Sequence, residues 1–284
     1  MVERAPDASP SPARECLHVG LVLEYDGTDF AGWQVQAGGA RTVQGVLGEA
    51  LARVCGAPAE VTGAGRTDAG VHALGQVAGV RVATRLAPAE LARALNGVLP
   101  PDVAVRAAEA APGGWHPRYH AAAKRYRYAI WNGPVRSPLR ARFSHWVPRP
   151  LDVPAMAEAA AALTGRHDFR AFQGAGSDVT DTVRTLQRAA VTGAPGGDVL
   201  LELEGDGFLR HMVRNVAGTL LEVGLGARPA ASLPALLAAR DRSRAGPTAP
   251  ARGLTLVEVA YGGGFLRNPG GLPAPALDGA ESLG

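Results

Sequence analysis

Segments with the pattern of strands and helices alternate in the same order in both halves of the sequence. In the first half, strand patterns occupy residues 18–25, 76–82 and 102–105, and helical apolar spacing follows Thr42 and Pro88. In the second half, strand patterns occupy residues 126–131, 185–191, 199–204 and 254–261, and helical patterns occupy 153–163 and 208–223. Sheet and helices in separate layers are typical of the α+β class. We therefore expect an α+β fold whose two similar halves join their sheets and leave a basic cleft between them.

Length and composition fit a folded globular protein. A chain of 284 residues with 46% hydrophobic content can bury a sizeable core in one large domain or two ordinary ones. Residues 1–16 are rich in Pro, Ala and Ser and predict a disordered leader, and the Gly/Pro-rich residues 268–284 predict a flexible tail. Between them we expect an N-terminal α+β domain over residues 17–115 and a C-terminal α+β domain over residues 116–267.

The sequence lacks the usual signals of secreted, zinc-binding and membrane proteins. Cys16 and Cys55 lie far apart and belong to no Cys/His cluster, which argues against a disulfide framework and a structural zinc site. No apolar run approaches the roughly 18 residues of a membrane span, and the first fifteen residues carry prolines and charges in place of an apolar signal-peptide core. We therefore expect a cytoplasmic protein.

Basic residues gather in three groups, although the formal net charge is only +3. The groups are Arg118, Lys124, Arg125 and Arg127; Arg136, Arg140, Arg142 and Arg149; and Arg240, Arg242 and Arg244. Grouped cations are the electrostatic footprint of a protein that binds a polyanion. A solvated arginine-rich surface is the alternative, and it is the better one for a chain without a catalytic loop.

A glycine-rich loop, residues 63–72, holds the most informative acidic residue, Asp68. Three glycines in eight residues allow a tight turn that lies close to another molecule. The loop lacks the spacing of a phosphate-binding or dinucleotide-binding motif. Arg66 stands two positions before Asp68, and an opposite charge nearby favours the ionised form of a carboxylate. Asp68 could then serve as a ligand-binding group, a general base or a nucleophile.

Two simpler interpretations of this loop remain open. Thr67 or Asp68 could cap a short helix, which would make the glycines turn residues only. His72 could form a metal pair with Asp68, but no further ligands are evident nearby, so we interpret His72 as a structural histidine that bonds the backbone.

Six separated motifs, in order, resemble the tRNA pseudouridine synthase A family, which modifies the anticodon stem-loop. Residues 65–72 (GRTDAGVH) resemble its active-site motif, and the match runs from about Leu21 to Tyr261. The other five motifs are YDG with FAGWQ at 25–34, TVQ at 42–44, KRYRY at 124–128, GFLRHMVRN at 207–215 and AGPTAP at 245–250. The resemblance implies the pseudouridine synthase fold, in which two α+β halves join antiparallel sheets.

The resemblance also implies a reaction and a set of site residues. Uridine at tRNA positions 38 to 40 would be isomerised to pseudouridine, with Asp68 as the catalytic carboxylate and with no cofactor or metal. Arg66 would enter the space that the flipped base vacates, and Tyr126 would stack on the extruded uracil. Arg214 matches the ion-pair partner of the catalytic aspartate. The implied partners are tRNA, recognised by its shape, and a second copy of the chain in a homodimer.

Apart from the resemblance, Tyr126 could be a core aromatic residue and Arg214 an exposed helix arginine. Basic residues on both sides of Tyr126 favour a strand that faces RNA. Two other functions compete with the isomerase: a non-catalytic RNA-binding or chaperone module, and a glycoside hydrolase. The hydrolase is disfavoured because that chemistry usually needs two carboxylates at a defined separation, and the loop offers one.

Overall fold

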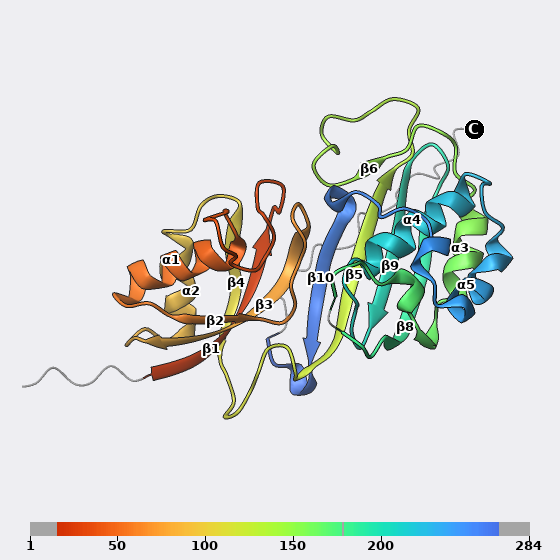
Figure 1. Cartoon of the computed structure of the whole chain (residues 1–284). Coiled ribbons are helices and arrows are strands. Elements are labelled where there is room, and N and C mark those ends of the chain that lie inside the picture. Colours follow the sequence, from red (N-terminus) through yellow and green to blue (C-terminus); the bar gives the residue numbers. More distant parts are fainter. Residues whose placement is uncertain (1–15, 178, 267–284) are drawn as a thin grey trace, which may run out of the picture.

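A computed structural model describes residues 16–177 and 179–266, and their strands form one ten-stranded sheet (Figure 1). Along the sheet the strands follow the order β4 (Val103–Ala110), β1 (Cys16–Tyr25), β3 (His72–Ala83), β10 (Leu254–Tyr261), β5 (Ala121–Trp131), β9 (Asp198–Gly205), β8 (Val183–Gly193) and β7 (Gly165–Asp168). Two short strands lie off this path, β2 (Glu60–Gly63) against β3 and β6 (His145–Trp146) against β5. The sheet is mostly antiparallel, which confirms the α+β class.

The sheet has an N-terminal part, β1 to β4, and a C-terminal part, β5 to β10. The two parts meet where β10 lies between β3 and β5. β10 pairs with β5 over most of its length, but it is parallel to β3 and pairs with it only at His72 and Ala73. β1 occupies the whole opposite edge of β3, so β2 must share the β10 edge, where it pairs with residues 78–81. The loop from β2 to β3, residues 64–71, therefore lies at the junction of the two parts.

Helices α1 (Val43–Cys55) and α2 (Pro88–Asn96) belong to the N-terminal part. The side chain of Thr42 caps α1 by accepting a hydrogen bond from the Gly45 N–H at 3.2 Å, and Gly56 ends the helix in the left-handed conformation, with φ 76°. Pro88 begins α2, where its missing N–H costs no helical hydrogen bond. Both starts agree with the expectations from sequence.

Helices α3 (Val153–Ala161), α4 (Met212–Gly224) and α5 (Leu233–Ala239) cover one face of the C-terminal part of the sheet (Figure 1). α4 is buried on nearly every side, including Gly218 and Thr219. A Cβ added at Gly218 would lie 1.7 Å from the carbonyl oxygen of Pro247. The backbone of residues 245–250 therefore packs directly on α4. Among the described residues, no helix is both long enough and apolar enough to cross a membrane.

Three sequence expectations need correction. α4 begins at Met212 rather than at 208, because His211 has a left-handed backbone with φ 58° and cannot continue a right-handed helix. The apolar spacing over 208–223 predicts a shared polar face for Arg210, His211, Arg214 and Asn215, and this face does not form. Arg210 and His211 precede the helix, and Asn215 is fully buried, where its Nδ2 donates to the carbonyl of Phe172 at 2.8 Å. Cys16, placed in the leader, begins β1.

Other sequence expectations were incomplete or remain predictions. Strands β2, β6 and β7 and helix α5 were not predicted, because each is too short to show a clear periodicity. Except for Cys16, the expected leader lies outside the described residues, and so does the tail at 268–284. The division into domains at residues 115 and 116 stays a prediction.

Candidate active site

The loop that carries Asp68 is held by the backbone of residues 27–33. The N–H of Trp33 donates to the carbonyl of Thr67 at 3.1 Å, and the N–H of Gly70 donates to the carbonyl of Phe30 at 3.3 Å. Gly32 has φ +99°, and a Cβ there would lie 2.7 Å from the Thr67 carbonyl oxygen. This close approach explains why a glycine-containing motif precedes the acidic loop in the sequence.

Buried polar side chains also hold this loop through hydrogen bonds. The hydroxyl groups of Tyr25 and Thr67 are 2.8 Å apart, and Gln76 Nε2 donates to the carbonyl of Gly65 at 2.8 Å. Burial raises the pKa of Tyr25 to about 12, so its hydroxyl keeps its proton at neutral pH. Thr67 therefore serves in this network and not as a helix cap.

His72 follows the loop and bonds the backbone, as expected. Its Nδ1 accepts a hydrogen bond from the N–H of Gly27 at 3.0 Å, and the ring is 2% exposed. Burial lowers the pKa of His72, although Asp26, with Oδ1 3.2 Å from Nδ1, acts in the opposite direction. Across residues 16–177 and 179–266, no group of three or more His, Cys, Asp or Glu side chains has a geometry that could hold a metal ion.

Arg214, in the first turn of α4, forms the close ion pair with Asp68. Its Nη1 donates to Asp68 Oδ2 at 2.9 Å, and its Nε donates to the carbonyl of Ala249 at 2.8 Å. The N–H of Ala249 donates in turn to the carbonyl of Arg214 at 3.1 Å. The side chains of Arg214 and Asp68 are 16% and 30% exposed, so this charge-assisted hydrogen bond is partly shielded from water.

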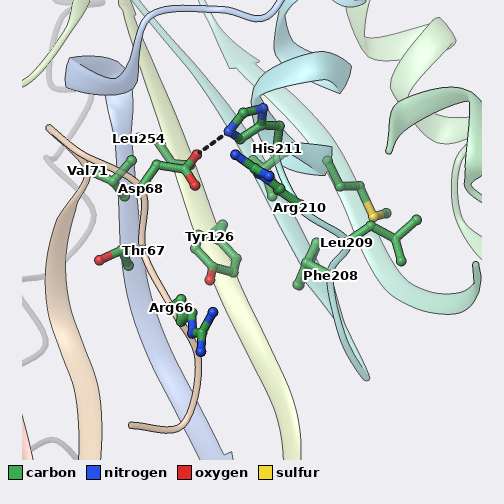
Figure 2. A pocket seen from close by; sticks show the side chains of 12 residues that line it. Arg66, Thr67, Asp68, Val71, Tyr126, Phe208, Leu209, Arg210, His211 and Leu254 are labelled. Carbon is green, nitrogen blue, oxygen red and sulfur yellow. Dashed lines mark ion pairs between the residues drawn. The ribbon is translucent and has the colours of Figure 1, made fainter. Parts of the chain in front are cut away.

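Arg66 does not hold the Asp68 carboxylate, in contrast to the expectation from their spacing. Its Nε donates to Gln34 Oε1 at 3.1 Å, and Figure 2 shows its side chain pointing away from Asp68. Two residues apart on a turning loop, the two side chains leave the backbone in different directions. The guanidinium beside the carboxylate therefore comes from α4.

His211 is a further neighbour of Asp68 that sequence reasoning did not assign to the site. Its Nε2 lies 3.5 Å from Asp68 Oδ2 (Figure 2). Burial lowers the pKa of His211, and the charges of Arg210 and Arg214 add to the effect while Asp68 opposes it. The only sequence signal was its position within the GFLRHMVRN motif.

Asp68, Tyr126 and His211 line one hollow of about 150 Å³ (Figure 2). Tyr126 is 8% exposed, and its ring meets the ring of Phe208 edge-on, with 5.0 Å between centroids. Burial raises the pKa of Tyr126. Tyr126 is thus more buried than expected of an RNA-facing strand, yet it lines the hollow. Arg66 and Arg210 also line the hollow, which makes its lining basic.

Many residues of the three basic groups already have carboxylate partners within the chain. The pairs are Arg125 with Glu258 (2.5 Å), Arg127 with Glu202 (3.0 Å), Arg140 with Asp198 (2.9 Å), Arg142 with Asp26 (2.9 Å) and Arg240 with Asp168 (3.0 Å). A guanidinium with such a partner contributes less net charge to the surface than its place in the sequence suggests. The grouping in the sequence therefore overstates the positive charge that is free to bind a polyanion.

Known proteins resemble this chain over most of its length. The family model for tRNA pseudouridine synthase matches residues 21–120 and 159–262. The tRNA pseudouridine synthase A of Myxococcus xanthus is 51% identical over 253 residues, which cover 88% of this chain and 95% of the relative. Proteins of the same name from Syntrophotalea carbinolica and Solidesulfovibrio magneticus are 49% and 48% identical and cover 86% and 93% of this chain, and 96% and 94% of their own lengths. These matches confirm the resemblance drawn from the motifs, and the chain belongs to the tRNA pseudouridine synthase family.

Proposed function

We propose that the protein isomerises uridine to pseudouridine in the anticodon stem-loop of tRNA, at positions 38 to 40, with Asp68 as the catalytic carboxylate. The observation that carries the proposal is that Asp68 lies at the wall of a basic hollow while Arg214 binds its Oδ2 at 2.9 Å. Membership of the family supports the reaction.

The reaction needs one ionised carboxylate at the junction of sugar and base. The bond from C1′ to N1 breaks, the uracil turns, and a bond from C1′ to C5 forms, while C5 loses a proton and N1 gains one. The product is an isomer, so no group donor or redox partner enters the balance. Arg214 forms a charge-assisted hydrogen bond with Asp68, and its second bond, to the carbonyl of Ala249, fixes the direction of the carboxylate.

The target nucleotide must leave the base stack before Asp68 can reach it, at a cost of a few kcal/mol. Tyr126 and Phe208 offer apolar ring surface inside the hollow for the extruded uracil. Arg66 lines the hollow and is exposed, which supports the proposal that it fills the space that the base leaves in the stack (Figure 2). Arg66 and Arg210 would also neutralise nearby phosphates.

We further propose that the enzyme acts in the cytoplasm, where its substrate is found, and as a homodimer. Exposed apolar side chains support self-association: Leu139 is 93% exposed and Val135 70% exposed, both on the connection from β5 to β6. Light scattering at enzyme concentrations above the assay range tests the dimer, and a monomer mass at all concentrations would reject it.

A release assay tests the isomerase. An anticodon stem-loop with tritium at uracil C5 is incubated with the protein, without added cofactor. The wild-type chain is expected to release tritium. Asp68→Asn is expected to release none while it still binds the RNA, because the amide keeps the shape of the carboxylate but not its charge. Asp198→Asn, a carboxylate paired with Arg140 away from the hollow, is the matched control and should retain activity.

The same assay distinguishes the isomerase from the main alternative function. A non-catalytic RNA-binding module predicts RNA binding with no release by the wild-type chain, and it predicts no effect of Asp68→Asn. The comparisons do not favour that alternative, because the relatives that cover most of the chain carry the name of the modifying enzyme.

A further inference from the structure

His211 has a backbone conformation that non-glycine residues rarely adopt. Its φ is 58° and its ψ is 2°, in the left-handed region, and its side chain makes no capping hydrogen bond to α4. The residue stands directly before the helix that carries Arg214. The local structure therefore gains nothing evident from a histidine at this position, and the contacts of its imidazole need another explanation.

Those contacts converge on one oxygen of Asp68. Oδ2 is 2.9 Å from Nη1 of Arg214 and 3.5 Å from Nε2 of His211. Among the described residues, the hydrogen bond to the Asp68 carboxylate engages Oδ2, and none engages Oδ1. Both partners approach from the α4 side, as Figure 2 shows for the imidazole. The carboxylate is thus held at one oxygen and leaves the other for a bound nucleotide.

The imidazole of His211 packs directly against Gly174, and we call this contact the glycine seat. A Cβ added at Gly174 would lie 2.7 Å from Nδ1, 2.9 Å from Cγ and 3.0 Å from Cβ of His211. The N–H of Gly174 donates to the carbonyl of Arg210 at 2.8 Å, which ties the seat to the residue before His211. All three nearest atoms belong to the His211 side chain, so that side chain would be the first to collide with a larger residue here.

We propose that His211 is a positioning residue for Asp68: its uncharged imidazole, as the Nε2–H tautomer, directs Oδ2 toward α4 and leaves Oδ1 facing the target nucleotide. The inference rests on the proposed function, since it assigns His211 a part in the same reaction. The left-handed backbone and the glycine seat are the features that bring the ring to this place.

The charge state of His211 matters for this role. The charged groups that face the ring are Asp68, Arg214, Arg210 and Arg242. Burial and the three guanidinium groups lower the pKa of His211 below 6.5, against the opposing effect of Asp68, so the ring is neutral at pH 7. As the pH falls through this pKa, a second cation forms beside Oδ2. Activity should then decline on the acid side, because the imidazolium adds a second ion pair at Oδ2 and disturbs the orientation of the carboxylate.

Two substitutions separate positioning from folding. His211→Gly accepts the left-handed backbone without strain, so it should fold with an unchanged thermal midpoint. Its kcat for tritium release should fall on the order of tenfold to a hundredfold, with little change in KM, because the carboxylate loses its orientation. His211→Gln keeps a neutral donor, so it should restore most of kcat and should lose the acid-side decline that the imidazole causes.

A double-mutant cycle gives the sharpest test. Gly174→Ala alone should lower kcat, because the new methyl group pushes the imidazole away from Asp68. In the His211→Gly background the same change should have no further effect, because the atoms that it would meet are gone. Additive losses would overturn the inference, as would a wild-type kcat for His211→Gly or an unaltered pH profile for His211→Gln. If the wild-type chain releases no tritium, the proposed function itself fails, which is a different outcome.

Discussion

Asp68 and Arg214 are 146 residues apart in the chain, yet their contact at 2.9 Å is shorter than that of Asp68 with His211 at 3.5 Å. Arg214 makes two directed hydrogen bonds, one to the carboxylate and one to the carbonyl of Ala249. A planar guanidinium can serve both at fixed angles, whereas an ammonium group cannot. The pair therefore sets the direction of the carboxylate as well as its charge.

Replacement of Arg214 tests this view of the pair. Arg214→Lys keeps the charge but not both bonds, so we expect kcat for tritium release to fall roughly a hundredfold, with RNA binding retained. Arg214→Gln should lose more, because the charge is gone as well. Equal kcat for Arg214→Lys and the wild type would show that charge alone suffices.

The ionisation of Lys124 depends on its burial in the fold. It lies on β5, two positions before Tyr126, and a Cβ at Gly65 would lie 3.4 Å from its Nζ. Burial lowers the pKa of Lys124 from 10.5 to about 8, and the charges of Arg118 and Arg184 add to the effect. A protonated lysine beside the catalytic loop suits a phosphate of bound RNA, at some cost to stability.

We predict the pH dependence of that cost from Lys124→Met. The folded-state pKa lies below the unfolded one, so the unfolded state binds more protons between about pH 8 and 10.5. Below pH 8 the variant should be more stable than the wild type in urea unfolding, and the difference should shrink as the pH rises toward 10.5. RNA affinity of the variant should be weaker. A stability difference that stays constant from pH 7 to pH 10 would contradict the assignment.

At the scale of elements, the contact of α4 with residues 245–250 connects packing to the site. Gly218 allows the carbonyl of Pro247 to approach the helix, and this same segment carries the Ala249 carbonyl that holds Arg214. Stability and site geometry therefore depend on one small residue in the middle of a helix.

Two glycines in helices, Gly218 and Gly48, test whether stability and site geometry depend on this close packing. Gly48 serves as the control. Gly218→Ala should destabilise the protein by about 1–3 kcal/mol and lower kcat, because a methyl group cannot fit beside Pro247. Gly48→Ala in α1 meets no atom within 4 Å, so it should stabilise the protein by up to about 1 kcal/mol and leave kcat unchanged. Urea unfolding and the release assay measure both. Similar effects of the two substitutions would refute the packing explanation.

Element types were largely predictable from sequence, but their limits were not. The cap at Thr42 and the proline at the start of α2 act over a few residues, so both starts followed from local patterns. The start of α4 did not, because apolar spacing continues through Leu209 while the backbone of His211 turns left-handed to meet Gly174. Strand β2 depends on its pairing with β3, which no local pattern reveals.

At the scale of the whole molecule, internal ion pairs redistribute the basic surface. Arg140 is bound by both oxygens of Asp198, at 2.9 Å each, and its guanidinium lies over the ring of Trp131. Within the part of the chain that the structure describes, Arg66 bonds only the neutral amide of Gln34. We therefore expect phosphate binding to concentrate at the junction of the two parts of the sheet.

The salt dependence of tRNA binding tests this distribution. Arg66→Gln should weaken binding and reduce the slope of log affinity against log salt by about one, as expected for one lost phosphate contact. Arg140→Gln should leave the slope unchanged, because its charge is already compensated by Asp198. The opposite ranking would place the RNA over the β5–β6 connection instead.

The sequence by itself determined the α+β class, most helix and strand positions and the motifs that identify the family, because caps, turns and periodicity act over a few neighbouring residues. Only the tertiary structure decided that Arg66 bonds Gln34 and not Asp68, that Tyr126 is buried at the hollow, and that His211 stands beside the carboxylate. These contacts join residues far apart in the chain. They exist because β10 brings β3 against β5 and thereby places the start of α4 beside the loop at 64–71.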